Sequence, residues 1–425
     1  MNINYDLARY KYDMEKCVGC KGCVWVDHIY MPSVEFGIKC ASNIYNPFDA
    51  YAYVGRSKIG LAVLAGRLDY SDKLLDVIYK CNLCGACDAG CKRNLDLELL
   101  SVLESLRAKC VADGKGPLPA HKAVADHIEA SGNRFGAPRK NRLQWLSPAA
   151  VSQGADLIYF PGCAASYLDN SIARATVEIL KRSGQAFATL ADQDYCCARP
   201  LLDAGLIDAA KKVAESNIRA FAATGAKTIL TSCAECYKTW KVDYPKLLSK
   251  STQDMPYTAM HLSEFVDDQL EKGKLRFTRQ VPLRATWHDP CNLGRLSEPW
   301  NHWEGNRGKF GLLDKPKEYR RGTHGVYKAP RNILSQIPGM ELVEMPRIRE
   351  NTLCCGAGGG VREAFRDYAR KIGEKRMTEA GSIAVEAVVS GCPYCKENFN
   401  NVRSPSEKGI KVYDLSEIVL MSLAD

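Results

Sequence analysis

Leu353-Cys-Cys-Gly-Ala-Gly-Gly-Gly360, followed further along the chain by Cys392-Pro-Tyr-Cys395, is the stretch that decides how this sequence folds. An earlier stretch repeats the order, because Cys196-Cys197 is followed by Cys233-Ala-Glu-Cys236. The spacing also agrees, because 35 residues separate the adjacent cysteine pair from the C-x-x-C motif in the first copy and 36 separate them in the second. The second half of the chain is therefore a duplication.

Each copy supplies five thiols once the single cysteine that precedes the pair is included. The first set is Cys163, Cys196, Cys197, Cys233 and Cys236, and the second set is Cys291, Cys354, Cys355, Cys392 and Cys395. Five thiols exceed the four ligands that a tetrahedral zinc ion takes. An iron–sulfur cluster suits this number better, and a zinc-based regulator is the alternative.

The cysteines follow short apolar runs that are typical of buried strands. These predicted strands are 156–160, 186–190 and 228–232 in the first copy and 283–288, 340–345 and 385–389 in the second. Helical patterns at 173–182, 207–224 and 361–380 lie between them. Alternating strands and helices predict parallel α/β units, whose sites form beyond the carboxyl ends of the strands. His261-Leu-Ser-Glu264 and Asp414-Leu-Ser-Glu417 follow the two sets and strengthen the case for duplication.

The copies differ by an insertion in the second one, near residues 296–323. It contains Trp300, His302, Trp303 and several lysines and arginines. A basic, aromatic insertion is consistent with a substrate lid, a docking loop for a partner subunit, or a passive surface excursion.

Eight further cysteines lie in the first 91 residues. The first run is Cys17, Cys20 and Cys23 with Cys40 after it, and the second is Cys81, Cys84, Cys87 and Cys91. Three cysteines at two-residue gaps favour a cubane cluster over a zinc ribbon. Because the fourth thiolate of each cluster comes from the other run in two-cluster ferredoxins, we expect Cys91 to join the first run and Cys40 to join the second.

Composition limits the other possibilities. The chain has 19 cysteines, and only Cys110 falls outside these sets, which predicts a buried structural thiol. The net charge of +9 is scattered without a nucleic-acid-binding motif. No apolar run reaches the roughly 20 residues of a membrane span, and no secretory signal is seen. We therefore expect a cytoplasmic protein whose cysteines bind metal in a reducing environment.

These patterns predict an α+β multidomain protein. The expected divisions are a helical ferredoxin-like domain (1–113), a linker (114–154), a first cysteine-rich α/β domain (155–280) and a second (281–425). Helices are expected at 59–66, 74–79 and 95–112 within the first domain. The linker is suggested by Pro117, Pro119 and Pro138.

The motifs resemble a known family. Cys354-Cys355-Gly356 within its five-cysteine pattern is similar to the cysteine-rich CCG domain. Two CCG domains behind a two-cluster module resemble the D-type chain of heterodisulfide reductase (HdrD). The N-terminal half is also similar to the BamD-type component of class II benzoyl-CoA reductase complexes. Ala198 replaces the glycine after the first cysteine pair, and the insertion is a second departure from the family pattern.

The resemblance implies two cubane [4Fe–4S] clusters in the N-terminal domain and up to two noncubane [4Fe–4S] clusters in the five-cysteine sets. It implies an electron-transfer component that works with a flavin-containing, HdrA-like partner, most closely of the BamD type. The alternatives are a catalytic component that reduces a heterodisulfide at the second set, and a scaffold in which the CCG domains only dock partners. No nucleotide or flavin fingerprint occurs, so we expect no flavin in this chain.

Five further side chains are candidates for a role in the chemistry. Arg199, Arg295 and Arg362 lie beside cluster cysteines and are candidates to bind anionic substrate tails, or else form structural ion pairs. His288 and His324 are possible proton donors to a leaving thiolate. His288 is the stronger candidate because it lies three residues before Cys291 at a strand end.

Overall fold

Two small parallel sheets organise the second half of the chain in the computed structural model, which describes residues 2–27, 29, 33–91, 95–402 and 409–423. The first sheet has the order β1-β2-β3, formed by Leu157–Tyr159, Thr228–Thr231 and Thr258–His261. The second has the order β5-β4-β6-β7, formed by Met340–Leu342, Leu283–Trp287, Ala387–Ser390 and Lys411–Asp414. All the pairings are parallel, as expected for alternating strands and helices.

The two sheets have equivalent strand orders. Ala188 makes a single parallel bridge to Ile158 on the outer side of β1, which is the place that β5 takes beside β4. The strand expected at 186–190 is therefore reduced to one residue pair. The mixed α/β architecture of the two copies is confirmed.

Helices flank both sheets. The first unit contains α8 (Gly162–Tyr167), α9 (Asn170–Arg182), α10 (Arg199–Ala204), α11 (Ile207–Ala223), α12 (Ala234–Lys238), α13 (Tyr244–Leu248) and α14 (Leu262–Glu271). The second contains α15 (Lys328–Gln336), α16 (Val361–Ala364), α17 (Arg366–Gly381), α18 (Pro393–Asn400) and α19 (Leu415–Ser422). The helix expected over 361–380 is broken at Phe365, whose φ of −141° and ψ of 58° are not helical.

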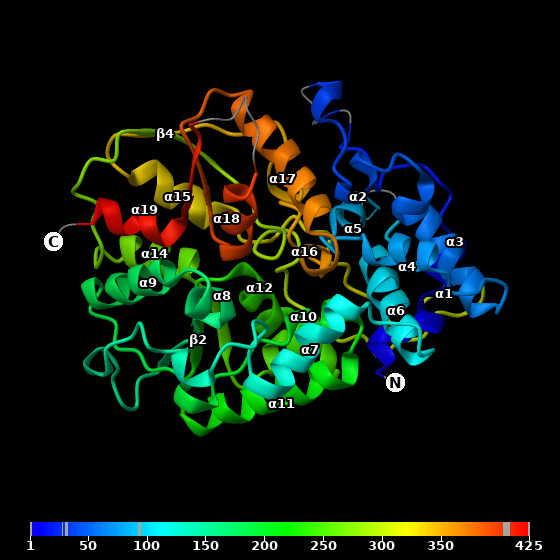
Figure 1. Ribbon diagram of the computed structural model, residues 1–425, viewed down its shortest axis with the longest axis horizontal. Helices are drawn as coiled ribbons and strands as arrows, with labels where there is room; N and C mark the ends of the chain where they lie inside the picture. The colour runs from blue at the N-terminus through cyan, green and yellow to red at the C-terminus, as the bar shows by residue number, and fades with distance from the viewer. Residues whose placement is uncertain (1, 28, 30–32, 92–94, 403–408, 424–425) are drawn as a thin grey trace.

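The two units pack against each other with approximate two-fold symmetry. Helix α9 contacts α19, and in the reciprocal position α14 contacts α15. Lys396 forms an ion pair with Asp169 at 2.7 Å across this boundary. Figure 1 shows the two units stacked at one end of the long axis, with the N-terminal helices at the other end.

The N-terminal part is helical. It contains α1 (Lys11–Glu15), α2 (Ala41–Ile44), α3 (Tyr53–Leu64), α4 (Asp72–Tyr79), α5 (Ala86–Cys91) and α6 (Leu99–Ala112). Helix α3 begins before the expected residue 59, and α6 begins after the expected residue 95. The late start of α6 follows from Asp96, whose φ is +51°, and from the Glu98 amide, which donates to Asp13.

The segment expected as a linker contains helix α7 (Pro119–Ser131), which starts with proline at its first turn and ends at Gly132 in the left-handed region. Helix α7 contacts α10 of the first unit and α16 of the second. His121 of α7 is hydrogen-bonded to the Gly360 carbonyl at 2.8 Å. Its ring also lies 5.1 Å from that of Tyr79, between ring centres, at the end of α4. This segment therefore connects all three parts of the molecule by side-chain contacts.

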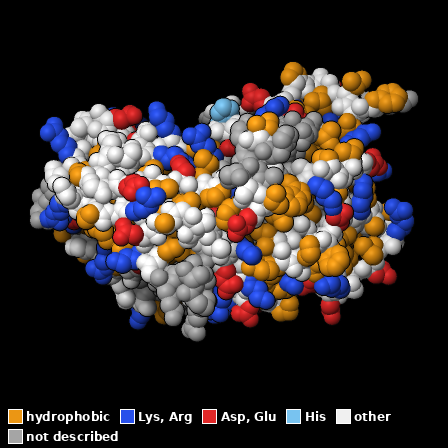
Figure 2. All heavy atoms as spheres, turned by 90° about the horizontal axis from the view of Figure 1, so that it is seen from above, with side chains coloured by type: hydrophobic (Ala, Val, Ile, Leu, Met, Phe, Trp, Pro, Cys, Tyr) orange, Lys and Arg blue, Asp and Glu red, His pale blue; other side chains and the backbone are white. Residues whose placement is uncertain are grey.

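The surface carries charges of both signs. Figure 2 shows lysines and arginines interspersed with aspartates and glutamates over the face in view. None of the helices formed by the described residues is long and apolar enough to cross a membrane.

Candidate metal centre

The thiols of the first five-cysteine set form a connected series at the carboxyl ends of the strands. Hydrogen bonds with Cys163 and Cys197 raise the pKa of Cys196 well above its usual value. Hydrogen bonds with Cys197 and Cys233 do the same to the pKa of Cys236. The series therefore runs from Cys163 through the adjacent pair to Cys236 and ends at Cys233. Cys163 lies in the first turn of α8, and Cys233 caps α12 directly after β2.

The second set has the same order in space. Hydrogen bonds with Cys291, Cys355 and Cys84 raise the pKa of Cys354 well above its usual value. The Cys395 thiol donates to the Cys355 sulfur at 3.2 Å, and Cys395 in turn is hydrogen-bonded to Cys392. All ten cysteines of the two sets are buried. Such clusters of buried thiols require a counter-charge or a metal to be stable as thiolates.

The two sets meet through equivalent residues. Hydrogen bonds with Cys233 and Cys395 lower the pKa of Cys392 well below its usual value. Cys233 follows β2 and Cys392 follows β6, and each begins the next helix of its unit. The ten thiols therefore form one connected arrangement at the boundary between the two α/β units.

The N-terminal cysteines fall into two groups that cross between the runs. A small cavity is lined by Cys40, Cys81, Cys84 and Cys87. Burial raises the pKa of Cys40, and the charges of Cys84 and Cys81 raise it further. Burial also raises the pKa of Cys91 to about 12, with contributions from Cys20 and Cys23. Cys40 thus lines one cavity with the second run, and Cys91 lies near Cys20 and Cys23 of the first run.

These four groups fit iron–sulfur clusters because their donor atoms are sulfur alone. The cavity among four cysteines, and the buried cations near the sets, are features of a site that holds a negatively charged thiolate cluster. Cys110 lies apart, and burial raises the pKa of its thiol to about 12, as expected for an inert structural cysteine.

A contact between the thiols of Cys84 and Cys354 joins the N-terminal part to the second set. The hydrogen bond with Cys354 lowers the pKa of Cys84 to about 5. Arg295, which is 4% exposed, spans the same junction. Its guanidinium donates to the Cys84 carbonyl at 2.6 Å, the Thr352 carbonyl at 2.6 Å and the Glu350 carbonyl at 2.9 Å. Arg295 therefore ties the second cysteine run to the segment that leads into Cys354.

The glycine-rich segment 356–360 allows this close approach. A Cβ atom on Gly359, whose φ is +66°, would lie 2.4 Å from the carbonyl carbon of Asn82. The Asn82 side chain donates to the Gly356 carbonyl at 2.7 Å, and buried Arg107 donates to the Gly359 carbonyl at 2.6 Å. The glycines thus admit the backbone of the second cysteine run.

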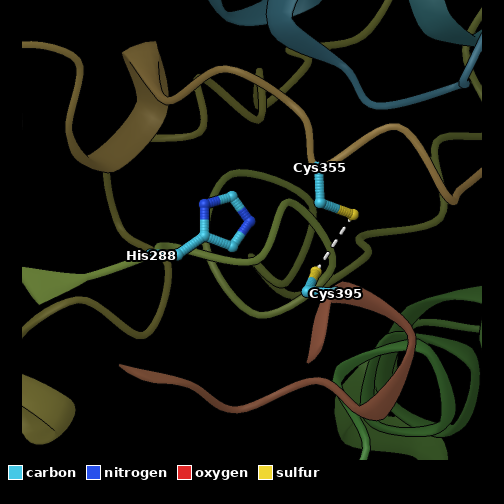
Figure 3. A group of neighbouring side chains, drawn as sticks. All are labelled: His288, Cys355 and Cys395. Carbon is cyan, nitrogen blue, oxygen red and sulfur yellow. Dashed lines mark hydrogen bonds between the residues drawn. The ribbon is translucent and has the colours of Figure 1, made fainter. Parts of the chain in front are cut away.

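His288, at the end of β4, lies against the second set. Figure 3 shows its ring beside the sulfur atoms of Cys355 and Cys395, and the three ligand atoms lie within 4.8 Å of one another. Burial lowers the pKa of His288, and the ring is 1% exposed. The arrangement makes this imidazole a direct neighbour of two of the five thiols.

The other predicted polar residues have different surroundings. Arg199 is paired with Asp203 at 2.9 Å and Asp243 at 3.2 Å, and Arg362 is paired with Glu363 and Glu397. His324 is exposed and lines a cavity whose wall contains no cysteine among the described residues. The contacts of Arg199 and Arg362 are those of structural ion pairs.

Two buried arginines were missed by the sequence reasoning. Arg142 donates to the Cys163 sulfur at 3.8 Å and is paired with Asp194 at 2.7 Å. Arg134 is paired with Glu235 at 3.2 Å and lies over the Tyr394 ring at 4.5 Å. Both lie in the segment predicted as a linker. The sequence around these two arginines contains prolines and glycines but no motif, so nothing there indicated that either arginine would lie near the thiols.

The insertion, here called the strap (residues 296–323), folds back on the N-terminal part. Lys317 is paired with Glu98 at 2.8 Å, Arg321 is paired with Asp96 at 3.0 Å, and Arg9 donates to the Trp303 carbonyl at 3.0 Å. Together with residues 3–13, α6 and the segment 238–246 of the first unit, it lines an open cavity of about 820 Å³. Part of its basic character is thus used in contacts within the chain.

Comparison with known proteins defines the class of protein. The family model described as "Cysteine-rich domain" (CCG) matches residues 157–241 and 317–400. The D chain of the heterodisulfide reductase of Methanosarcina barkeri is 30% identical over 97% of this chain and 94% of its own length. The B chain of the fumarate reductase (CoM/CoB) of Methanothermobacter marburgensis is 28% identical over 82% of this chain and 62% of its own length. EtfAB:quinone oxidoreductase of Syntrophomonas wolfei is 25% identical over 81% of this chain and 46% of its own length.

The fold, the thiol sets and these relatives define an iron–sulfur oxidoreductase component. More particularly, the chain belongs to the HdrD family of heterodisulfide reductase components, with two CCG domains. The resemblance to this family is thereby confirmed. The second CCG match begins at residue 317, within the strap, and so does not include Cys291.

Proposed function

We propose that this chain relays electrons within a cytoplasmic, multisubunit oxidoreductase, through two cubane clusters in its N-terminal part and a noncubane cluster in each five-cysteine set. Two contacts between thiols support this proposal most directly: Cys84 contacts Cys354, and Cys233 contacts Cys392. These contacts join three of the four thiol groups into one series. When bound, such clusters accept and donate single electrons.

The residues that would hold each cluster follow from the grouping of the thiols. Cys17, Cys20, Cys23 and Cys91 would hold the first cubane, and Cys40, Cys81, Cys84 and Cys87 the second. The two five-cysteine sets would hold the noncubane clusters. Arg142 and Arg295 place buried positive charge beside Cys163 and Cys84, which favours the charged thiolate.

The exposure of the cysteines indicates where electrons would enter the chain. Cys20 is exposed, whereas the other eighteen cysteines are buried or partly buried. An exposed ligand allows a redox partner to approach closely, so the first cubane is the proposed point of contact with a flavin-containing, HdrA-like partner. The absence of a nucleotide fingerprint from the sequence supports placing the flavin in that partner.

Within this family we propose the BamD-type role, in a class II benzoyl-CoA reductase complex. The alternative is reduction of a heterodisulfide at the second set, and the name and coverage of the Methanosarcina barkeri relative favour this alternative. In that reaction the buried sulfurs of the set would face a disulfide, and a neighbouring group would protonate the leaving thiolate.

The test is anaerobic purification from the native host, with iron counted and the co-purifying proteins identified. Four clusters predict about 16 iron atoms per chain, whereas cubane clusters alone predict about eight. A flavoprotein together with a tungsten protein would support the BamD-type role. A membrane protein that carries haem b would support heterodisulfide reduction. Zinc without visible absorbance would contradict both.

Cysteine variants make this test specific. Cys354→Ser should remove the iron of the second set and interrupt electron transfer, while Cys110→Ala, which changes a buried cysteine outside the sets, should leave the iron content unchanged. Equal iron loss in both variants would indicate a general failure to fold and would contradict the assignment.

A further inference from the structure

A series of buried charged groups ends on His288. Arg347 is paired with Glu379 at 2.8 Å, and Glu379 is paired with Arg376 at 2.5 Å. Arg376 Nε then donates to His288 Nδ1 at 3.2 Å. These four side chains are at most 4% exposed. Two arginines on one carboxylate hold the Arg376 guanidinium firmly in place.

This contact determines which ring nitrogen of His288 carries the proton. A guanidinium has donors and no acceptor, so Nδ1 must accept and the proton of the neutral ring lies on Nε2. Figure 3 shows the ring nitrogen next to the side-chain attachment directed away from the thiols and the other nitrogen directed toward Cys355 and Cys395. The ligand nitrogen of His288 and the Cys355 sulfur lie within 4.8 Å of each other. The ring therefore presents an N–H donor to the Cys355 sulfur.

The ring is held in this orientation by its surroundings. The His288 amide donates to the Val389 carbonyl of β6 at 2.9 Å, which fixes the backbone at the strand end. The Phe399 ring meets the imidazole edge to face, with the ring centres 4.9 Å apart. Flipping the ring would place a carbon against the Arg376 N–H and leave two buried donors unpaired.

The first copy has no histidine at the position equivalent to His288. The residue three positions before Cys163 is Phe160, which packs against Trp240 with ring centres 5.5 Å apart. The two five-cysteine sets therefore differ at one equivalent position, apolar in the first copy and a fixed N–H donor in the second.

We propose that Arg376 is a positioning residue that fixes His288 as an Nε2–H donor to the Cys355 sulfur, and that this hydrogen bond raises the reduction potential of the second site. The inference rests on the proposed function, since it requires a cluster in that site. A donor to a ligand sulfur stabilises the reduced, more negative state of a cluster.

The same geometry argues against two other roles for His288. Binding iron through Nε2 would remove the proton that the Arg376 contact leaves there. Acting as a proton donor would require Nδ1 to take up a new proton on the side where Arg376 already donates. The hydrogen-bond role is the one that satisfies both ring nitrogens.

The test compares His288→Leu, which removes the donor, with His288→Gln, which keeps an amide N–H at the position of Nε2. Potentials are measured by redox titration of the whole, anaerobically purified chain, followed by electron paramagnetic resonance. In His288→Leu we expect the one-electron equilibrium of one noncubane site to shift about tenfold toward the oxidised state, about 59 mV. His288→Gln should retain most of the wild-type potential. The other site is the internal control, and Phe160→Leu should not alter the potential of the second site.

The role of Arg376 is tested through the double variant. Arg376→Met should lower the same potential, and adding His288→Leu should produce no further change, because the two residues act through one hydrogen bond. If Arg376→Met fails to fold, Arg376→Lys keeps the charge and one donor and should retain a near-wild-type potential. An additive effect of the two substitutions would overturn the positioning role.

Nitrogen-15 labelling of histidine distinguishes a donor from a ligand. Electron–nuclear double resonance should detect an exchangeable proton and only weak nitrogen coupling at the second site. Strong nitrogen coupling, or an unchanged potential in His288→Leu with about 16 iron atoms retained, would overturn this inference alone. About eight iron atoms in the wild-type chain would instead contradict the proposed function and, with it, this inference.

Discussion

Cys233 and Cys392 occupy the same place in the two copies, and their thiols lie close enough for each to shift the pKa of the other. A contact between equivalent residues is self-complementary and lies on the approximate two-fold axis of the duplication. The two sites thus meet through one specific pair of thiols. The second cysteine run approaches from outside this symmetry, because Cys84 contacts Cys354 of the second set.

The crossed grouping of the N-terminal cysteines predicts different outcomes for Cys40→Ser and Cys91→Ser. Each substitution should reduce the iron content by about four atoms per chain. Cys40→Ser should also abolish the magnetic interaction between the second cubane and the second five-cysteine site, because Cys84 lies beside Cys354. Cys91→Ser should preserve that interaction. Iron analysis and electron paramagnetic resonance check both, and the reverse pattern would show that the runs do not cross.

Gly359→Ala should separate the N-terminal part from the second set. The new Cβ would lie 2.4 Å from the Asn82 carbonyl carbon, at a φ of +66°. We expect the free energy of unfolding to fall by about 1–3 kcal/mol from backbone strain, with slower reduction of the second site. Gly409→Ala is the matched control, since Gly409 has a φ of +119° but no atom within 4 Å of the added methyl group. Stopped-flow reduction and denaturation measure the two effects, and equal reduction rates in both variants would contradict the role of Gly359.

Ala198→Gly should stabilise the protein. Ala198 has a φ of +73° directly after Cys197, and Gly356 is also left-handed at the equivalent position after Cys355. A left-handed alanine costs about 1–2 kcal/mol, part of which is offset because glycine gains more freedom in the unfolded chain. A net gain of about 0.5–1 kcal/mol should raise the thermal midpoint. An unchanged or lower midpoint would show that the loop tolerates alanine without strain.

Asp414→Asn should flatten the dependence of stability on pH. Burial raises the pKa of Asp414 to about 7 from its ordinary value of 3.8. Above pH 3.8 the unfolded chain loses this proton while the folded protein keeps it, so stability falls as pH rises toward about 7 and is level beyond that. Asparagine retains the cap that Asp414 provides to the Ser416 amide. Thermal midpoints between about pH 5.5 and 8 check this, and an equal slope in both proteins would contradict it.

Much of the site could be predicted from the sequence, because its ligands recur at spacings that strands and helices impose. Cys233 and Cys392 had to lie at carboxyl ends of strands, since an apolar run leads into each and a helix follows. The duplication, the parallel sheets and the position of His288 beside the second set follow from the same periodicity. The strand at 186–190 was overestimated, because its apolar residues cannot reveal that only one residue pair there forms a bridge.

The sequence pattern alone indicates two equivalent α/β units, each with five thiols gathered at one sheet edge, and a cysteine-rich N-terminal part. Three features depend on how the whole chain packs: the contact of Cys84 with Cys354, the charges of Arg142 and Arg295 beside the thiols, and the contact of Arg376 with His288. Residues within one motif are held close by the local backbone, and their spacing is written in the chain. Contacts between residues that are far apart in sequence arise from the packing of whole units, which no local pattern encodes.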